Sequence, residues 1–325
     1  MAIIHGGELA DARAHGGDGP ILDLSTGINP HAYPAAFAPD VLRPLPQREA
    51  DDRLRDAARR AYHVPDDADI VAAPGTQAIL QWLPHCLPAT RVTVIGPTYQ
   101  EHAAIWSRHA PTTTVPTIDD APATGLTVIV NPNNPDGRFV AADRLAAHAA
   151  ATQSEAIALV VDEAFGDLAP ERTAAGTART LVLKSFGKFY GLAGLRLGFA
   201  IGPAEAIAPL RAALGPWAVS GPALEIGARA LADAPWAAAM RERLARERAE
   251  LDGALATAGL TVVGGTDLFR LVETEDAAAW HAALAREGIW TRIFPTHPRR
   301  LRIGLPGEAL PRLEAALAHI GERPE

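Results

Sequence analysis

The segment LVLKSFGKFYGLAGLRLGF (181–199) contains both lysines of the 325-residue chain, Lys184 and Lys188, and the other 28 of its 30 basic residues are arginine. Arginine stays protonated, whereas lysine can lose its proton and attack a carbonyl carbon to form an imine. A chain that keeps lysine in a single segment is therefore expected to use an amine there. The alternative is that the two lysines fell together by chance on a solvated loop, and it stays open for Lys184.

On both sides of this segment, short β-branched runs alternate with alanine-rich stretches of helical pattern. The expected strands are DIVAAP (69–74), RVTVIGP (91–97), LTVIVNP (126–132), IALVVDE (157–163), RTLVLKS (179–185) and LGFAIG (197–202), with helices at 76–83, 98–109 and 141–153. Short apolar strands separated by helices are typical of a mostly parallel sheet covered on both faces. The fold class is therefore expected to be α/β.

The pattern changes after Leu214. The expected elements are two long helices (220–233 and 235–258), FRLVET (269–274), a helix at 275–287, IWTRIF (289–294), LRIGL (301–305) and a final helix. These favour a smaller α+β domain. The first 45 residues have little periodicity and are interpreted as an arm that packs over another surface. We therefore expect an arm at 1–45, a large α/β domain at 46–215 and a small α+β domain at 216–325.

Composition limits the class of protein. Nearly half of the residues (48%) are apolar, yet no eighteen of them follow one another without interruption, so no transmembrane helix is expected. The single Cys86 and a beginning without a basic and then apolar signal segment favour the cytoplasm. The net charge of −8 is spread along the chain without a basic patch, so nucleic acid is not an expected partner. No metal site is expected either.

Polar residues follow five of the expected strands. They are Gly75-Thr76-Gln77, Tyr99, Asn134, Asp162, and Ser185 with Lys188. Each by itself could be an ordinary turn or helix cap. Because ligands bind at the carboxyl ends of strands in such sheets, the whole set predicts a site.

The order of PGTQ (74–77), PTY (97–99), NPNNPDG (131–137), VVDEAF (160–165), SFGK (185–188) and GLRLGF (194–199) resembles the fold-type I pyridoxal-phosphate enzymes of the class I/II aminotransferase group. The resemblance runs from about residue 1 to 320. Within that group, HGG (5–7), LSTGINP (24–30), DEAF (162–165) and KFYGLAGLRLGF (188–199) look most like the threonine-phosphate decarboxylases of cobalamin biosynthesis. The resemblance implies a seven-stranded-type sheet and pyridoxal 5'-phosphate as cofactor.

The resemblance assigns one group of residues to the cofactor's aldehyde and phosphate. Lys188 is similar to the family's Schiff-base lysine, and Arg196, eight residues later, to its phosphate-binding arginine. Ser185 matches a phosphate-binding hydroxyl. Gly75-Thr76-Gln77 would open a helix whose backbone N–H groups hold the phosphate, and a plain helix cap is the alternative.

A second group is assigned to the cofactor's ring. Asp162 matches the aspartate that faces the pyridine nitrogen, Asn134 the residue that bonds the 3-oxygen, and Tyr99 the aromatic residue that stacks on the ring. A structural acid, a turn asparagine and a core aromatic are the alternatives. Two positions depart from the aminotransferase pattern: Phe165 replaces a tyrosine, and Leu45-Pro46 replaces the Tyr-Pro that contributes a phosphate contact to the partner subunit.

The substrate residues also come from the resemblance. Arg302 in RLRIGLPG matches the arginine that binds the substrate carboxylate, whereas Arg299 and Arg300 are interpreted as surface residues. His5 and Asn29 lie in the arm that resembles the substrate-phosphate region of the decarboxylases. For His5 a disordered terminus is the alternative.

These matches imply decarboxylation of L-threonine O-3-phosphate to (R)-1-amino-2-propanol O-2-phosphate by a homodimer, with Lys188, Asp162 and Tyr99 as catalytic residues. One alternative is an aminotransferase that acts on a compound such as histidinol phosphate and breaks the α C–H bond instead. Another is a regulatory protein that binds the cofactor without catalysis, against which the lack of an appended segment argues. Motifs do not decide between decarboxylation and transamination, because that choice depends on which α-carbon bond stands perpendicular to the ring.

We expect the purified protein to be yellow, and borohydride to fix the cofactor covalently on Lys188. Lys188→Ala should lose the adduct, whereas Lys184→Ala at saturating cofactor should keep it, because only Lys188 stands eight residues before Arg196. Peptide mass spectrometry locates the adduct, and a cofactor trapped on Lys184 would contradict the assignment.

Overall fold

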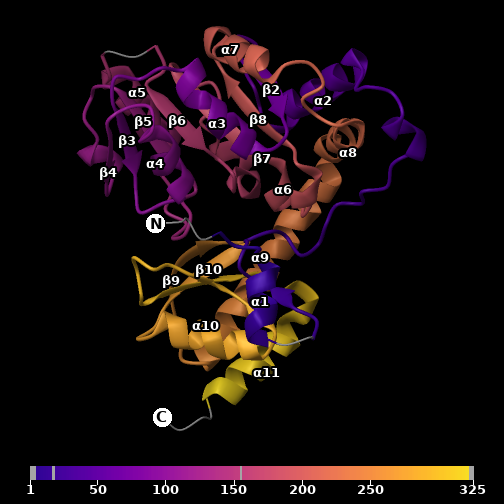
Figure 1. Ribbon diagram of the computed structural model, residues 1–325, viewed down its shortest axis with the longest axis vertical. Coiled ribbons are helices and arrows are strands. Elements are labelled where there is room, and N and C mark those ends of the chain that lie inside the picture. The colour runs from indigo at the N-terminus through magenta and orange to yellow at the C-terminus, as the bar shows by residue number, and fades with distance from the viewer. Residues whose placement is uncertain (1–4, 17–18, 154–155, 322–325) are drawn as a thin grey trace. The chain divides into compact units, whose positions relative to one another are not determined.

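The computed structural model describes residues 5–16, 19–153 and 156–321, and the chain forms two compact units (Figure 1). The smaller unit comprises the chain up to His31, Pro135–Gly137, and the chain from Ala238 onward. The larger unit comprises Ala32–Asn134 and Arg138–Ala237. Helix α9 (Ala234–Thr257) begins in the larger unit and ends in the smaller one.

A seven-stranded sheet in the order β2-β8-β7-β6-β5-β3-β4 forms the centre of the larger unit. Its strands are β2 (Asp69–Ala73), β3 (Val92–Ile95), β4 (Thr112–Val115), β5 (Leu126–Val130), β6 (Leu159–Asp162), β7 (Thr180–Ser185) and β8 (Gly198–Gly202). The five strands from β7 to β4 are parallel, and β8 is antiparallel to both β2 and β7. The predicted mostly parallel sheet is therefore confirmed. Strand β4, whose sequence is the polar TTTV, was not anticipated.

The helices of this unit lie before, between and after its strands along the chain. They are α2 (Arg48–Ala61), α3 (Thr76–Cys86), α4 (Gln100–Trp106), α5 (Ala142–Ala151), α6 (Phe186–Phe189), α7 (Ala204–Leu214) and α8 (Gly221–Ala232), with 3-10 turns η1 (Pro39–Leu42), η2 (Ile118–Asp120), η3 (Gly166–Leu168), η4 (Pro170–Arg172) and η5 (Ala193–Leu195). Val160 of β6 and Leu183 of β7 belong to one buried cluster with Ile79 of α3, Ile105 of α4 and Ile207 of α7. This face of the sheet is therefore the one that α3, α4 and α7 cover.

The smaller unit contains a four-stranded antiparallel sheet in the order β12-β13-β10-β9 and a parallel pair, β1 with β11. The strands are β1 (Leu22–Asp23), β9 (Thr261–Thr266), β10 (Phe269–Glu273), β11 (Ile289–Trp290), β12 (Arg292–Ile293) and β13 (Arg300–Gly304), and the helices are α1 (Leu9–Gly16), α10 (Ala277–Arg286), α11 (Leu310–Gly321) and the 3-10 turn η6 (Gly307–Ala309). The expected single strand IWTRIF is split at Thr291 between two sheets.

We expected domain boundaries at residues 45 and 215. The chain passes from one unit to the other at different residues. Helix α8, which we expected in the small domain, packs against α2 in the larger unit. Gly227 of α8 makes this approach possible, because a Cβ there would lie 2.9 Å from Leu54 Cδ1 of α2. Among the described residues, no helix is both long enough and apolar enough to cross a bilayer.

Candidate active site

Asp162, the last residue of β6, is buried and held on both carboxylate oxygens. Its Oδ2 lies 2.9 Å from His102 Nε2, and its Oδ1 accepts a hydrogen bond of 3.0 Å from the backbone N–H of Ala164. The imidazole N–H donates and the carboxylate accepts, so the carboxyl plane is fixed. Each oxygen keeps a second lone pair for another donor, such as a protonated ring nitrogen.

His102 is a site residue that the sequence did not reveal. It is buried on α4, and its ring meets that of Tyr99 edge to face, with centroids 5.9 Å apart and an interplanar angle of 84°. Its Nδ1 has no hydrogen-bond partner within the described ranges. In PTYQEH, Tyr99 and His102 are three residues apart, so on a helix they lie on the same face. The sequence does not reveal that Asp162 lies beside that face, and for this reason it does not identify His102.

The loops after β3 and β5 are tied together by Asn133. Its Oδ1 accepts a 2.6 Å hydrogen bond from Thr98 Oγ1, and its Nδ2 donates to the Pro97 carbonyl at 3.0 Å. These two loops carry Tyr99 and Asn134. The Tyr99 hydroxyl also donates to Gln77 Oε1 at 3.3 Å, which joins the ring to the start of α3.

An anion cradle lies at the start of α3. Gly75 precedes the helix with a φ of 84°, and a Cβ there would lie only 2.7 Å from a terminal nitrogen of Arg196. Gly198 of β8 packs as closely, since its Cβ would lie 2.6 Å from the backbone nitrogen of Thr76. Backbone N–H groups of a helix start and a guanidinium therefore face the same place, an arrangement suited to a phosphate.

Lys188 lies on the single helical turn α6, directly after β7. Aromatic packing fixes this turn: Phe186 stacks on Tyr190 at 4.4 Å, and Tyr190 stacks on Trp236 at 5.5 Å. Lys188 Nζ lies 5.9 Å from the centre of the Phe165 ring, and Lys188 is half-buried. Ser185, also half-buried, ends β7 and occupies the N-cap position of the turn, where its side chain makes no capping hydrogen bond.

Lys184 has a different position. It is fully buried on β7, and its Nζ lies 2.5 Å from Glu163 Oε2. The alternative that Lys184 lies on a solvated loop is therefore wrong. The reason is the register of the parallel strands, which places the lysine opposite the end of β6 inside the fold.

The substrate residues expected from the arm and from LRIGL lie in the smaller unit. Arg302 of β13 is 5% exposed, and its guanidinium donates to the Ser25 carbonyl. The backbone N–H of Gly7 donates to Ser25 Oγ at 2.8 Å, so the segments HGG, LSTG and RLRIG meet at Ser25. Burial lowers the pKa of Arg302 to about 9, and neighbouring Arg292 acts in the same direction.

Asn29 and His5 are the two expected substrate residues of the arm. Asn29 is 2% exposed, and its Oδ1 accepts a 2.8 Å hydrogen bond from the backbone N–H of His31. His5 is half-buried. These two and Arg302 belong to the smaller unit, and the other nine expected site residues, from Gly75 to Arg196, belong to the larger one.

The residues of the larger unit fit pyridoxal phosphate, the cofactor that the resemblance implies. The glycine-lined cradle beside Arg196 suits its phosphate, the oriented carboxylate of Asp162 suits its ring nitrogen, and Lys188 offers an amine. Among the described residues, no cluster of three or more histidine, cysteine or acidic side chains has the arrangement of a metal site.

Residues 42–320 match the family described as aminotransferase class I and II, and the chain belongs to this family. At the level of individual proteins, the chain is 43% identical to threonine-phosphate decarboxylase from Sinorhizobium sp. over 332 aligned residues, which cover 98% of each. It is 38% identical to threonine-phosphate decarboxylase from Pseudomonas aeruginosa over 335 aligned residues, again 98% of each.

Solved structures show the same fold. The structure of histidinol-phosphate aminotransferase from Sinorhizobium meliloti in complex with pyridoxal-5'-phosphate superimposes with a TM-score of 0.79 at 20% identity, over 99% of this chain and 95% of that one. The expected fold-type I architecture is confirmed.

Gly198→Ala should weaken the affinity for pyridoxal phosphate by about tenfold or more, because the new methyl group would push the first N–H groups of α3 away from the cradle. Gly194→Ala is the matched control, since nothing lies within 4 Å of a Cβ at that position. Cofactor titration followed by visible absorbance measures both. Equal affinities for the two variants would mean that the start of α3 does not hold the phosphate.

Proposed function

We propose that this protein is a pyridoxal-phosphate enzyme that removes CO2 from L-threonine O-3-phosphate and releases (R)-1-amino-2-propanol O-2-phosphate for cobalamin assembly. The observation that carries the proposal is the similarity to two threonine-phosphate decarboxylases over 98% of the chain. The larger unit supports it with the residues that such a reaction needs: a held carboxylate, an anion cradle and an amine.

Each cofactor-holding residue has a separate task in this proposal. Arg196 and the start of α3 bind the phosphate, and Tyr99 lies against the ring. Asp162, oriented by His102, holds a proton on the ring nitrogen. Asn134 bonds the 3-oxygen. Pyridoxal phosphate supplies, when bound, an electron-accepting ring for the electron pair that is left on the substrate α-carbon.

The reaction breaks the bond between the α-carbon and the carboxylate carbon. The carboxylate carbon leaves as CO2, the bonding electron pair stays on the α-carbon, and a proton must then be added there. Lys188 supplies that proton in our proposal, since an amine that can both lose and gain a proton is suited to the task. Its neighbour Phe165 is buried and apolar, so it excludes water on that side.

Arg302 and the glycine-rich arm are assigned to the substrate. Burial has lowered the pKa of Arg302 to about 9, which still leaves its guanidinium charged at neutral pH. The planar, charged guanidinium can therefore bind the substrate carboxylate. His5 and Asn29 are assigned to the substrate phosphate. The close packing of HGG on Ser25 supports a folded arm rather than a disordered end, since Gly7 donates to Ser25 Oγ.

Purified enzyme should release CO2 from threonine phosphate and form no glutamate from histidinol phosphate and 2-oxoglutarate. Loss of a charged phosphate contact costs transition-state binding, so threonine without its phosphate should react at about a hundredfold lower kcat/KM. Rapid glutamate formation without CO2 would reject the decarboxylase and favour the aminotransferase. His5→Ala should reduce the preference for threonine phosphate while cofactor affinity stays unchanged.

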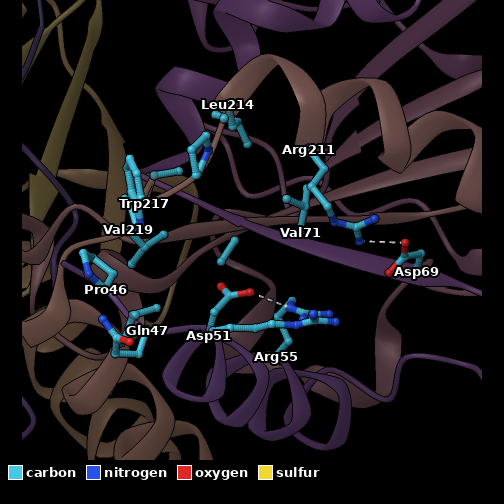
Figure 2. A pocket seen from close by; sticks show the side chains of 16 residues that line it. Pro46, Gln47, Asp51, Arg55, Asp69, Val71, Arg211, Leu214, Trp217 and Val219 are labelled. Carbon is cyan, nitrogen blue, oxygen red and sulfur yellow. Dashed lines mark hydrogen bonds and ion pairs between the residues drawn. The ribbon is translucent and has the colours of Figure 1, made fainter.

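We also propose that the protein works in the cytoplasm as a homodimer. Leu42, Leu45 and Trp217 are 63%, 58% and 59% exposed, although all three are large apolar residues. Trp217 lines a cavity of about 610 Å³ in the larger unit (Figure 2). Leu45 lines a groove that shares Pro46, Gln47 and Leu224 with this cavity. Such a surface is suited to a second copy of the chain. Cys86 is a free thiol, which fits a reducing compartment.

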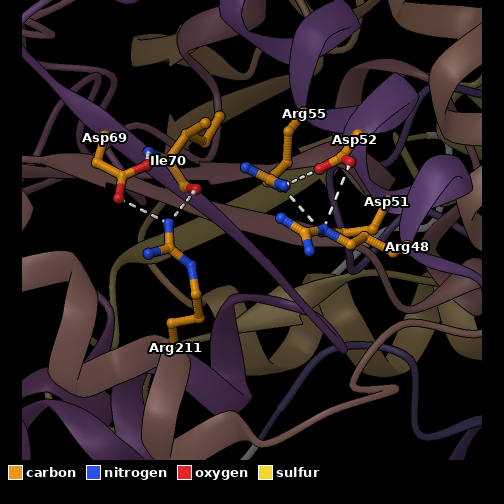
Figure 3. A network of polar contacts seen from close by, with 7 residues as sticks. All are labelled: Arg48, Asp51, Asp52, Arg55, Asp69, Ile70 and Arg211. Carbon is orange, nitrogen blue, oxygen red and sulfur yellow. Dashed lines mark hydrogen bonds and ion pairs between the residues drawn. The ribbon is translucent and has the colours of Figure 1, made fainter.

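Paired charges line one side of the same cavity, and Figure 3 shows their contacts. Arg55 binds Asp51 at 2.8 Å and also Asp52, while Arg211 binds Asp69 at 2.7 Å and the Ile70 carbonyl at 3.2 Å. An apolar centre with a polar rim is the usual composition of a protein interface. Arg55 and Arg211 are already paired with carboxylates of the same chain, so they do not oppose the approach of a second copy.

Trp217→Glu should shift the protein toward monomers, because a carboxylate would have to lose its water when the surface is covered. Sedimentation equilibrium at working concentrations measures the change. Trp82→Glu is the control, since Trp82 is also exposed (42%) but lies on α3 and does not line this cavity. A dimer that survives Trp217→Glu, or a wild-type monomer with full activity, would reject the proposed interface.

A further inference from the structure

A buried ion pair lies directly beside two residues of the site. Glu163 follows Asp162 in the chain, and Lys184 precedes Ser185. Lys184 is not exposed at all, Glu163 is 2% exposed, and Nζ of the lysine lies 2.5 Å from Oε2 of the glutamate. Among the described residues Nζ meets no partner in hydrogen-bonding geometry, so its contact with Glu163 is an ion pair. The centre of the Tyr62 ring is 5.1 Å away.

The pair lies on the opposite face of the sheet from Asp162. Successive side chains of a strand point to opposite faces, and Leu183 and Val160 face α3, α4 and α7. Asp162 points to that same side, where it meets His102 of α4. Lys184 therefore points to the other side, toward Tyr62 and Glu163. It does not contact the cofactor cradle or the substrate, so any effect on the reaction must be indirect.

The Glu163 carboxylate joins three pieces of backbone. Besides Lys184 on β7, it accepts a 2.7 Å hydrogen bond from Thr173 Oγ1 and a 2.6 Å hydrogen bond from the backbone N–H of Ala174. These contacts close the loop that follows β6, and that loop carries Phe165 beside the Lys188 amine. One carboxylate thus fixes the end of β6, the end of β7 and the loop between them.

Stability alone is a weak reason for such a pair. Taking two charges out of water costs about as much as their attraction returns, and apolar residues of similar size often stabilise a fold equally well. A buried pair does fix one geometry, because each charge tolerates only a narrow range of positions for its partner. The position of this pair, next to Asp162 and four residues before Lys188, favours that explanation.

We propose that the Lys184–Glu163 pair is a positioning device, which holds Asp162, Phe165 and the Lys188 turn in register from the far side of the sheet. The inference rests on the proposed function in one respect, namely the roles given there to Asp162 and Lys188. It also gives a reason for the second lysine of the chain that does not require a reactive amine.

The double variant Lys184→Met/Glu163→Gln removes both charges and keeps the shape of both side chains. We expect its Tm to stay close to that of the parent, its kcat to fall about tenfold or more, and its KM to change less than about twofold, because the misplaced groups act in the transition state. Two further readouts do not depend on activity. The affinity for pyridoxal phosphate should weaken about tenfold, and amide exchange in residues 163–174 of the cofactor-free protein should become faster.

Arg144→Met/Asp119→Asn is the matched control, because it removes an ion pair of the same unit whose two side chains are 52% and 74% exposed. It should leave all of these quantities unchanged.

Lys184→Arg keeps a cation against Glu163 and should retain most of the parent kcat. This variant decides the question if the double variant does not fold. A double variant with parent kcat and parent exchange rates, or Lys184→Arg with no more activity than Lys184→Met, would overturn the inference.

Failure of the proposed function has a different signature. If the parent enzyme releases no CO2 from threonine phosphate, the decarboxylase proposal fails. Cofactor affinity and amide exchange of the pair variants still test the positioning role in that case, since neither measurement uses a substrate.

Discussion

The parallel hydrogen bonding of β6 with β7 is the constraint on which the site depends. Asp162 stands opposite Leu183 in this register, and the Glu163 N–H donates to the Leu183 carbonyl at 2.9 Å. Because both strands end at the same edge of the sheet, the carboxylate after one and the lysine turn after the other are brought to one place. A slip of a single residue would reverse the faces and turn Asp162 away from His102.

The two faces of the sheet near this edge have different tasks. On one face, α4 supplies His102 to hold Asp162, and the start of α3 meets Arg196 to form the cradle. On the other face, a buried charge pair joins the strand ends to the loop that carries Phe165. Rigid elements therefore surround the polar groups on both sides, and preorganised groups need little rearrangement when charge develops during a reaction.

Much of the site could be predicted because its residues follow strands in chain order. Gly75, Asn134, Asp162 and Lys188 each come directly after an apolar run, and the motifs around them are specific. His102 and Glu163 could not be assigned in this way. Their partners are 60 and 21 residues away in the chain, so only the packing of α4 and the pairing of β6 with β7 reveal them.

The sequence by itself determined the α/β class and most of the strands and helices, and it named nine candidate site residues in the larger unit, because local periodicity and motif spacing are written in neighbouring residues. Tertiary structure decided what depends on contacts between distant segments. It placed α8 in the larger unit by packing it on α2, split IWTRIF between two sheets, and buried Lys184 on Glu163 where a solvated loop had been an open alternative. Burial and partner choice are properties of the packed chain, and a lysine has the same local sequence whether its amine lies in water or in an ion pair.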